Sequence, residues 1–370
     1  MKKRTLALAV ILALVLTLLS ACGSSPNSNP ATNDQSASSP APADDSAPSA
    51  PAVQPAADAI TLTMSIGNGV KSDNFQKYSA FCDKVAELSG GSLIIELYPG
   101  GTLASDADAL TAVMSGDVDF CHLTAGAALK AIKDLAVLEV PGAFGYKGDD
   151  DTTSFIEFEA KLHDTVESIF ADYGIKYIAF NASAQAVIVC NSKQITTPAD
   201  MQGLTMRTSG TWLGQMLESW GAATVSMGIG DLATGLERNT VSGTLTAYGA
   251  CTGNKLYEVA PYVTYMSQVN GVSSLVMNMD TWNSLTAEQQ GWLDEAAEHY
   301  MQFGQEYMAE YYAQAAEEME AGGATLYYLS ADEEAAFMAC TEQLYASMKE
   351  TCTDKGIKLI ELVEEWNAGN

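Results

Sequence analysis

Arg207 is the residue of this chain whose chemistry most needs an explanation. It lies in the segment GLTMRTSGTWLG (203–214), among apolar and small residues, and past the first four residues the only other arginine is Arg238. A guanidinium presents paired N–H donors in one plane, which fit the two oxygens of a carboxylate. We therefore predict that Arg207 binds a carboxylate. The alternative is an ion pair with an acidic residue of the protein, such as Asp231.

Polar residues at the ends of predicted strands are the next candidates for a binding site. Thr124 and Thr246 end two strands that each follow a helix and a turn, in ALTAVMSGDVDFCHLT and LATGLERNTVSGTLT. Asn68 follows the first predicted strand, and Asp106 begins a helix after the second. Ligands bind outside the carboxyl ends of the strands in open α/β sheets, so we predict all four in the site. For Asn68 and Asp106, a turn or capping role is the alternative.

No pattern in the sequence predicts catalysis or a bound metal. A nucleophile elbow and a dinucleotide-binding glycine loop are both absent. The histidines at 122, 163 and 299 do not have the spacing of zinc ligands. Six cysteines besides Cys22 have no short pair spacing, and buried thiols are favoured over a disulfide framework. We expect no enzyme, no cofactor and no metal site.

The charge balance excludes several classes of partner. The formal net charge is −28, from 18 Lys+Arg against 46 Asp+Glu. Such a field repels nucleic acid and anionic lipid surfaces. A small organic anion is repelled too, unless a local positive group outweighs the field within a Debye length of about 8 Å. This requirement again directs attention to Arg207.

The N-terminal residues 1–22 resemble a lipoprotein signal peptide. Three basic residues precede an apolar run, Leu6 to Leu19, which is shorter than the roughly 20 residues that span a bilayer. The sequence LSAC that ends at Cys22 matches a bacterial lipobox, in which the cysteine carries the lipid. The alternative is an ordinary signal peptide with a chance cysteine. We expect lipid attachment at Cys22, which anchors the protein to the extracytoplasmic face of the cell membrane without spanning it.

Residues 23–58 predict a disordered tether. They are mostly Ser, Pro, Ala, Asp and Asn, with almost no large apolar side chain. Such a segment buries too little surface to offset the entropy lost on ordering.

The chain from residue 59 predicts two α/β domains. Strands at ITLTMSIGN, SLIIELYPGG and DVDFCHLT alternate with helices, and the same alternation recurs from Thr197 to Gly249. This order is typical of parallel sheets covered by helices. We predict crossing strands near Asn181 and Gly271, and a ligand cleft between the domains. The predicted domains comprise 59–181 with 271–310 and 182–270 with 311–330, followed by C-terminal helices at 331–370.

One predicted helix is longer than a domain is wide. From Thr286, where a capping-box pattern begins, helical composition continues to Ala321 despite Gly291 and Gly304. Such a helix is on the order of 50 Å long. It shows no sustained heptad pattern, which disfavours a coiled coil. We predict that it braces both domains.

Several segments together resemble the substrate-binding proteins of TRAP (tripartite ATP-independent periplasmic) transporters, of the dicarboxylate-binding type. They are LSGGSLIIELYPGGTLASDADALTAVMSGDVDF, LAVLEVPGAFG, TPADMQGLTMRTSGTWLGQMLESWGAATVSMGIGDLATGLERNTVSGT, LYEVAPYVT and LTAEQQGWLDEAAE. The resemblance implies a two-domain periplasmic-binding-protein-like fold. It also implies capture of a small organic acid and its delivery to membrane permease subunits. A binding module that feeds a membrane sensor is the alternative.

The same resemblance implies roles for individual residues. Arg207 occupies the position of the arginine that forms a salt bridge with the ligand's carboxylate. The chain departs from the family at Val187, where many members carry a second arginine, and at Thr246, where asparagine is common. These departures favour a monocarboxylate with an apolar or aromatic tail, with Trp212 and Tyr248 as walls. Core packing is the alternative for both aromatic residues.

Overall fold

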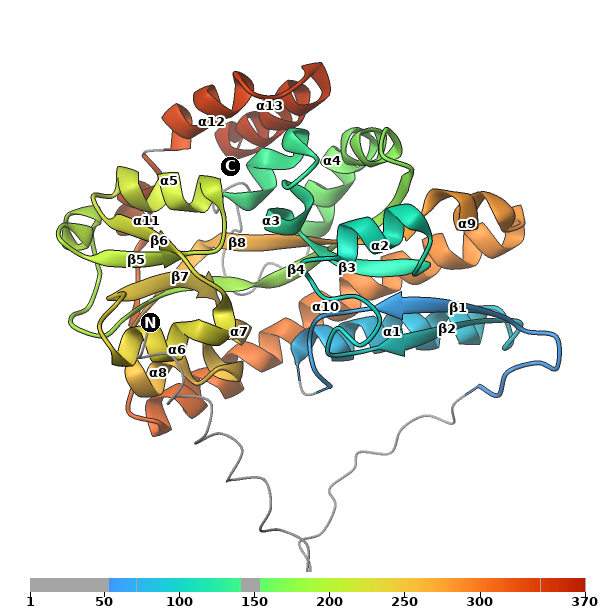
Figure 1. The fold of residues 1–370 in the computed structure, drawn as a ribbon, viewed down its shortest axis with the longest axis horizontal. Coiled ribbons are helices and arrows are strands. Elements are labelled where there is room, and N and C mark those ends of the chain that lie inside the picture. The colour runs from blue at the N-terminus through green and yellow to red at the C-terminus, as the bar shows by residue number, and fades with distance from the viewer. Residues whose placement is uncertain (1–52, 71, 141–153, 340, 370) are drawn as a thin grey trace, which may run out of the picture. The chain divides into compact units, whose positions relative to one another are not determined.

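The computed structural model describes residues 53–369 except 71, 141–153 and 340 (Figure 1). The predicted signal peptide (1–22), the lipid attachment site Cys22 and most of the tether (23–58) lie outside these residues. Within the described part, no helix has the length and apolar character that crossing a membrane requires.

A nine-stranded sheet runs through the fold in the order β2-β1-β3-β8-β4-β7-β5-β6, with β9 beside β8. Neighbouring strands are parallel within β2-β1-β3 and within β7-β5-β6, and antiparallel where β3, β8, β4 and β7 meet. The strands are β1 Ile60–Ser65, β2 Leu93–Tyr98, β3 Phe120–Thr124, β4 Ile175–Cys190, β5 Thr205–Thr208, β6 Ala223–Ser226, β7 Gly243–Ala247, β8 Tyr262–Asn278 and β9 Thr325–Tyr328.

Helices alternate with these strands, so the fold is α/β, as predicted. The helices are α1 Asp73–Leu88, α2 Ala109–Ser115, α3 Ala125–Ala128, η1 Lys133–Glu139, α4 Ser154–Ala171, η2 Pro198–Met201, α5 Thr211–Ser219, α6 Ile229–Glu237, α7 Tyr248–Gly253, α8 Leu256–Val259, α9 Met279–Ser284, α10 Ala287–Ala321, α11 Ala331–Met338, α12 Thr341–Lys349 and α13 Asp354–Gly369.

Two lobes share the long strands β4 and β8. We call β1, β2 and β3 with α1 and α2 lobe 1, and β5, β6 and β7 with α5, α6 and α7 lobe 2; Figure 1 shows them on opposite sides. In lobe 1, Ile175 of β4 pairs with Asn278 of β8, and in lobe 2 Cys190 pairs with Tyr262. The register between the strands shifts from Ala182 to Ala186. The predicted crossing strands are thus confirmed.

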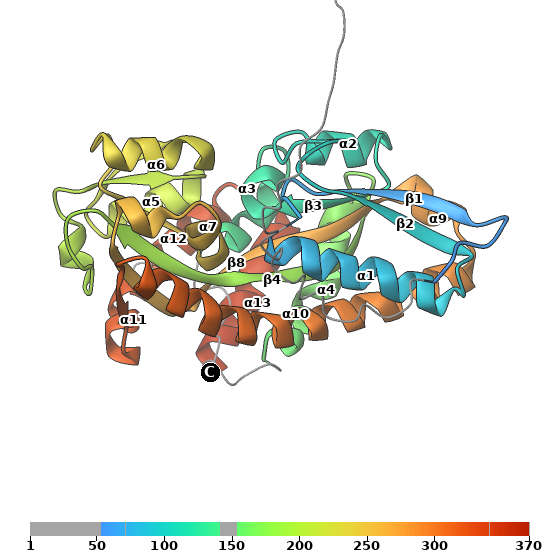
Figure 2. The same cartoon turned by 90° about the horizontal axis from the view of Figure 1, so that it is seen from below.

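Helix α10 is unbroken over 35 residues and packs against both lobes, as predicted. Its first turn has the expected capping box, in which the side chains of Thr286 and Gln289 satisfy each other's backbone N–H groups. Tyr300 lies in the apolar core of lobe 1, whereas Met308 and Met319 lie in that of lobe 2. Figure 2 shows the helix running beneath β4 and β8. A single rigid element therefore supports both lobes.

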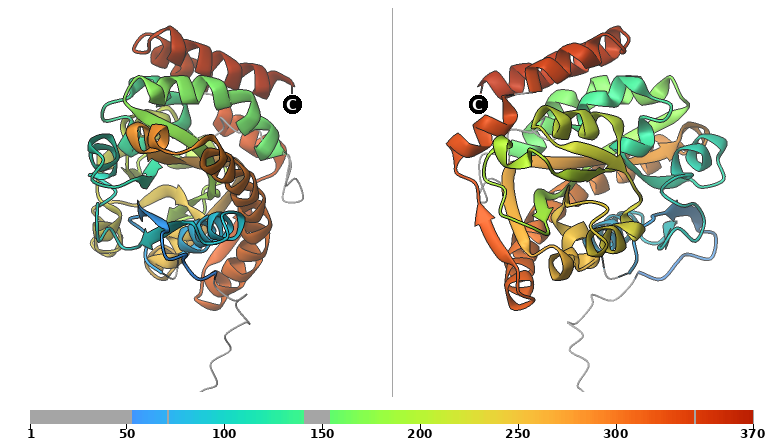
Figure 3. Two further views of the ribbon diagram at one scale, coloured as in Figure 1. Left: turned by 90° about the vertical axis from the view of Figure 1, so that its right-hand side faces the viewer. Right: turned by 60° about the vertical axis from the view of Figure 1, so that its left-hand side comes forward.

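The C-terminal helices pack on two different parts of the fold. Helix α13 contacts α4 and η1, and the ring of Trp366 lies 5.4 Å from that of Phe158. Figure 3 shows α13, in red, beside the green α4. Helix α11 instead contacts lobe 2, where Phe337 packs against Trp220 with ring centroids 4.9 Å apart.

The start of β7 has room only for a glycine. A Cβ atom at Gly243 would lie 2.2 Å from the carbonyl oxygen of Val189 in β4. We expect Gly243→Ala to lower the free energy of unfolding by about 1–3 kcal/mol, since the two strands must separate to admit the methyl group. Urea denaturation measures this change.

Gly291→Ala is the matched control. Gly291 is exposed in α10, and a Cβ atom there meets nothing within 4 Å. Because alanine favours helix over glycine, this variant should gain about 0.5–1 kcal/mol. Equal effects of the two substitutions would contradict the steric argument.

Candidate functional site

Arg207 is buried at the end of β5 without an acidic partner. Its side chain is 6% exposed, and its Nε–H donates to the carbonyl oxygen of Met227 at 2.8 Å. Among the residues that the structure describes, Arg207 forms no ion pair, so the alternative pairing with Asp231 is absent there. Burial lowers the pKa of the guanidinium, which nevertheless stays charged at neutral pH.

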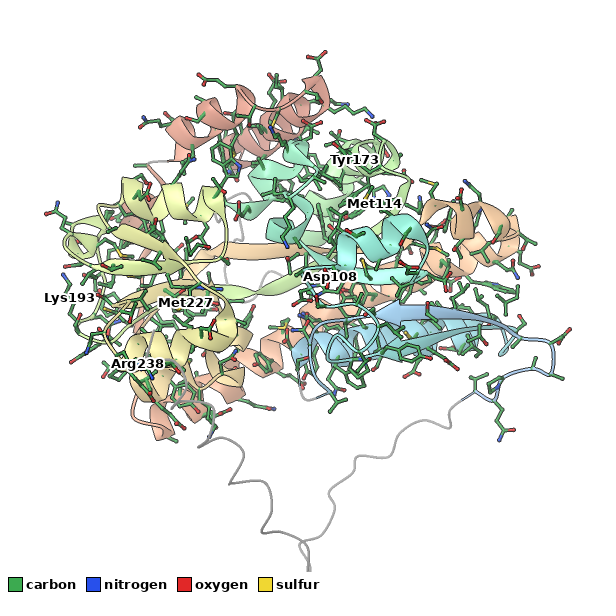
Figure 4. All side chains as sticks on the ribbon, in the orientation of Figure 1. Asp108, Met114, Tyr173, Lys193, Met227 and Arg238 are labelled. Atoms are coloured by element: carbon green, nitrogen blue, oxygen red, sulfur yellow. The ribbon has the colours of Figure 1, made fainter. Side chains whose placement is uncertain are left out.

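The sheet of lobe 2 fixes the backbone of Arg207. Arg207 pairs with Val225 of β6 on one side and with Thr244 of β7 on the other. The hydroxyl of Thr244 donates to the carbonyl oxygen of Arg207 at 3.3 Å. Met227, whose carbonyl group orients the guanidinium, lies between β6 and α6 and is labelled in Figure 4. A buried cation is thus held by three strands and one loop.

Thr124 and Thr246 end β3 and β7, as predicted, and both are half-buried. The hydroxyl of Thr124 accepts a hydrogen bond from the backbone N–H of Ala127 at 3.2 Å and so caps the short helix α3. Thr246 pairs with Val187 of β4. Ligand contact by either threonine stays a prediction.

Asn68 and Asp106 lie in loops that follow β1 and β2. The side-chain oxygen of Asn68 accepts from the Nδ2 group of Asn74 at 3.2 Å, and its carbonyl oxygen accepts from Gly100 at 2.8 Å, so Asn68 has the turn role given as the alternative. The carboxylate of Asp106 lies against Gly67, where a Cβ atom would be only 2.0 Å from Oδ1. Asp106 is exposed, and its carboxylate accepts no hydrogen bond from the residues that the structure describes.

The two predicted aromatic walls differ in their surroundings. Tyr248 is 2% exposed, and its ring makes T-shaped contacts with Tyr265 and Tyr312. Core packing, the alternative for this residue, therefore accounts for its side chain. Trp212 is half-buried at the start of α5 and packs only partly against the core.

Val187 stands where, by the resemblance, many members carry a second arginine, and it lies in the interior of lobe 2. Its side chain is fully buried among the apolar residues of lobe 2, beside Val189 and Leu232. An arginine at this position would be buried in that core.

Glu139 is a residue near this region that the sequence did not single out. Its Oε2 accepts from the backbone N–H of Trp212 at 3.2 Å, at the N-terminus of α5, where the helix dipole favours negative charge. A Cβ atom at Gly210 would lie 1.4 Å from Oε1, so any other residue there would displace the carboxylate of Glu139. Burial raises the pKa of Glu139, and the hydrogen bond from Trp212 opposes this shift. The only sequence signal was the LEVPG motif.

Two further buried polar side chains, Lys77 and His122, lie within lobe 1. Lys77 of α1 is completely buried, with Nζ 3.1 Å from the carboxylate of Asp73 and 3.8 Å from the sulfur of Met308. His122 of β3 is 4% exposed, and its ring lies 5.6 Å from that of Tyr78. Neither ring nitrogen of His122 has a hydrogen-bond partner among the described residues. The sequence pattern placed neither residue in the interior.

The described residues contain no cluster that suggests a metal site, and their cysteines are unpaired. Cys82, Cys121, Cys190 and Cys251 are buried, as favoured from the sequence, whereas Cys352 is half-buried. The remaining cysteine of the folded part, at position 340, lies outside the described residues.

The sequence pattern of bacterial extracellular solute-binding protein family 7 (DctP) matches residues 65–351. Because this match takes in most of the chain, the protein belongs to that family. The ectoine/5-hydroxyectoine-binding periplasmic protein UehA of Ruegeria pomeroyi is 26% identical over 204 residues, or 55% of this chain and 60% of UehA. The chain thus aligns with less than two-thirds of that relative. The C4-dicarboxylate-binding protein DctB of Bacillus subtilis is 24% identical over 271 residues, 72% of this chain and 75% of DctB.

The fold agrees with that of solved proteins of this kind. A TRAP periplasmic solute-binding protein from Marinobacter aquaeolei, in an apo open structure, has a TM-score of 0.75 at 20% identity. The superposition covers 82% of this chain and 99% of that protein. The expected two-domain periplasmic-binding-protein-like fold is therefore confirmed.

His122 should make the fold sensitive to acid. Its burial lowers the pKa of the imidazole, against smaller opposing effects of Asp106 and Asp73, while Lys77 adds to the lowering. The unfolded chain, with a histidine pKa of about 6.5, then binds a proton that the folded protein excludes. The free energy of unfolding should fall as the pH drops from 7 to 5, and fall less in His122→Gln. Urea denaturation across this range measures the difference.

His163 provides a control of opposite sign. A hydrogen bond to Glu159, 2.7 Å from Nδ1, raises the pKa of His163. Its contribution to stability is present below a pH of about 6.5 and is lost as the pH rises through the folded pKa. His163→Gln should therefore steepen the loss of stability in acid. If both variants follow the parent curve, neither histidine controls it.

Proposed function

We propose that this protein is the solute-binding component of a TRAP transporter. It captures a small organic acid outside the cytoplasm and delivers it to the membrane permease. The observation that carries this proposal is a buried arginine, Arg207, with no acidic partner in the described part of the chain. A buried cation without a counter-ion is costly, and a ligand carboxylate removes that cost.

The location of Arg207 supports ligand binding rather than a purely structural role. It lies at the carboxyl end of β5, next to the turn that leads into α5. In parallel α/β sheets this edge is where ligands bind. Among the described residues only Nε of the guanidinium has a partner, Met227, and the Nη groups provide the paired donors that a carboxylate fits. We propose that the two lobes close on the bound acid.

The relatives support binding rather than catalysis. UehA and DctB are named for the solutes they bind, ectoines and C4-dicarboxylates. We propose that this chain likewise binds its solute without transforming it. Delivery to a transporter is favoured over delivery to a sensor because the Marinobacter protein of the same fold is a TRAP solute-binding protein.

Removing the guanidinium should weaken binding of the acid. Hydrogen bonds to charged groups contribute about 1.5–3 kcal/mol each. Arg207→Ala should therefore raise the Kd at least about tenfold, the factor that 1.4 kcal/mol represents. Arg207→Lys should also weaken binding, because an ammonium group lacks the planar fork. Isothermal titration calorimetry with an acid found by thermal-shift screening measures both.

Arg238→Ala is the control, since it removes the same charge from lobe 2. Arg238 is exposed at the end of α6 and is labelled in Figure 4. Its loss should leave the Kd within about twofold, as expected for a screened surface charge. Should folded Arg207→Ala bind as well as Arg238→Ala, the guanidinium of Arg207 is structural.

We further propose that lipid on Cys22 holds the protein at the extracytoplasmic face of the membrane, with residues 23–58 as its tether. The LSAC sequence supports this proposal. Cys22→Ala should move the protein from the membrane fraction to the soluble fraction, because the acyl chains supply the membrane affinity. Fractionation of cells fed labelled palmitate measures both location and label. Unlabelled wild-type protein would refute lipid attachment.

A further inference from the structure

A group of four ionisable side chains lies where lobe 1 approaches the predicted site. We call Asp73, Lys77, Asp106 and His122 the α1–β3 cluster. Asp73 begins α1, Asp106 precedes α2, and His122 lies two residues before the end of β3. Of the charges that act on His122, that of Asp106 is the largest, followed by those of Lys77 and Asp73. These side chains therefore share one region, at the carboxyl ends of β1 and β3.

This region also adjoins lobe 2. A Cβ atom on Gly249 of α7 would lie 3.1 Å from the Oδ1 atom of Asp73 and 3.4 Å from the hydroxyl of Tyr311 in α10. The other carboxylate oxygen of Asp73 pairs with Lys77 at 3.1 Å. Through Asp73, the cluster thus reaches α7 of lobe 2 and the long helix α10.

His122 is the member that points to a ligand. It is more than nine-tenths buried, and both ring nitrogens lack a hydrogen-bond partner within the described chain. A buried imidazole in this state is costly unless another molecule satisfies it. With burial lowering its pKa, His122 is neutral at neutral pH and presents one acceptor and one donor nitrogen.

The charge of the cluster selects what it binds. Two carboxylates and one ammonium give a net charge of −1 with His122 neutral, and Lys77 is already paired with Asp73. The carboxylate of Asp106 is exposed and accepts no hydrogen bond from the described residues. This arrangement attracts a cation or an N–H donor and repels a second carboxylate. Arg207 in lobe 2 has the opposite preference.

We propose that the solute is an organic acid that also carries a protonated or N–H-bearing nitrogen. Its carboxylate binds Arg207, and its nitrogen binds Asp106 and the acceptor nitrogen of His122. This inference rests on the proposed binding of an organic acid and adds the chemical class of that acid. The protein then distinguishes zwitterionic acids from plain monocarboxylates and from dicarboxylates of the same carbon skeleton.

A thermal-shift panel of matched acids tests the class. One set consists of 4-aminobutyrate, butyrate and succinate, and another of proline and cyclopentanecarboxylate. Each further set compares an acid that carries a nitrogen with an acid of the same carbon skeleton that does not. We expect the nitrogen-bearing member to raise the Tm most in the sets that bind. The full chain without its signal peptide serves as the protein.

Two aspartate variants locate the nitrogen subsite. Asp106→Asn should raise the Kd of the best nitrogen-bearing acid about tenfold, because it removes the exposed carboxylate. Asp108→Asn is the matched control: Asp108 is also exposed, accepts a hydrogen bond from Ser105 at 2.7 Å and is labelled in Figure 4. Its Kd should stay within about twofold of the parent. His122→Gln should weaken the nitrogen-bearing acid more than its plain counterpart.

The outcomes separate this inference from the proposed function. If plain acids or dicarboxylates raise the Tm and no nitrogen-bearing acid does, the zwitterion class is wrong and organic-acid binding stands. If nitrogen-bearing acids bind but Asp106→Asn and Asp108→Asn behave alike, the assigned subsite is wrong. If no acid of any class raises the Tm, both the inference and the proposed function fail.

Discussion

The antiparallel pairing of β4 with β8 is the constraint on which the two lobes depend. Each strand passes through both lobes, so each lobe's sheet is completed by the same two segments of chain. The parallel strands of lobe 1 and lobe 2 are thereby attached to one continuous ladder of hydrogen bonds. The register of this ladder shifts between Tyr177 and Ala179 within lobe 1, and again between Ala182 and Ala186 where the strands pass from one lobe to the other. Because β3 pairs with β8 and β7 pairs with β4, this ladder determines where the carboxyl ends of β3 and β7 lie relative to each other.

Burial gives a single arginine its influence in so acidic a protein. The chain has 46 acidic against 18 basic residues, and a solvent-exposed arginine would be screened within about 8 Å. Arg207 is 6% exposed, so its charge acts through a medium of lower polarity, where an unpaired charge costs more and a paired one gains more. The α1–β3 cluster presents the opposite sign, with Lys77 and His122 buried and Asp106 exposed. Arg207 and the α1–β3 cluster therefore place one positive and one negative group locally within a protein of strongly negative net charge.

The sequence predicted the elements whose local signals agree with the fold. The sequence alone predicted the alternating strands and helices, the capping box at Thr286 and the turn of small residues after β5. It also predicted Arg207 as a cation in an apolar strand. The interior position of Lys77 was not predicted, because it depends on α10 crossing α1, as its contact with Met308 shows. Tyr248 illustrates the converse. An aromatic residue beside a predicted site has the same local pattern whether it faces a ligand or the core, and only its contacts with Tyr265 and Tyr312 decide.

The contact between Glu139 and the start of α5 has a mechanical consequence. Glu139 ends η1, which packs against α13, while the N–H group that it accepts from belongs to Trp212 of lobe 2. On another side of the fold, α10 is common to both lobes. A rotation that pulls α5 away from η1 exposes the start of α5 and removes the hydrogen bond that the buried carboxylate of Glu139 accepts from Trp212. A rotation about this contact does neither. This contact therefore favours a rotation axis that passes close to Glu139. Gly210 leaves the room that the carboxylate of Glu139 occupies there, since a Cβ atom would lie 1.4 Å from Oε1.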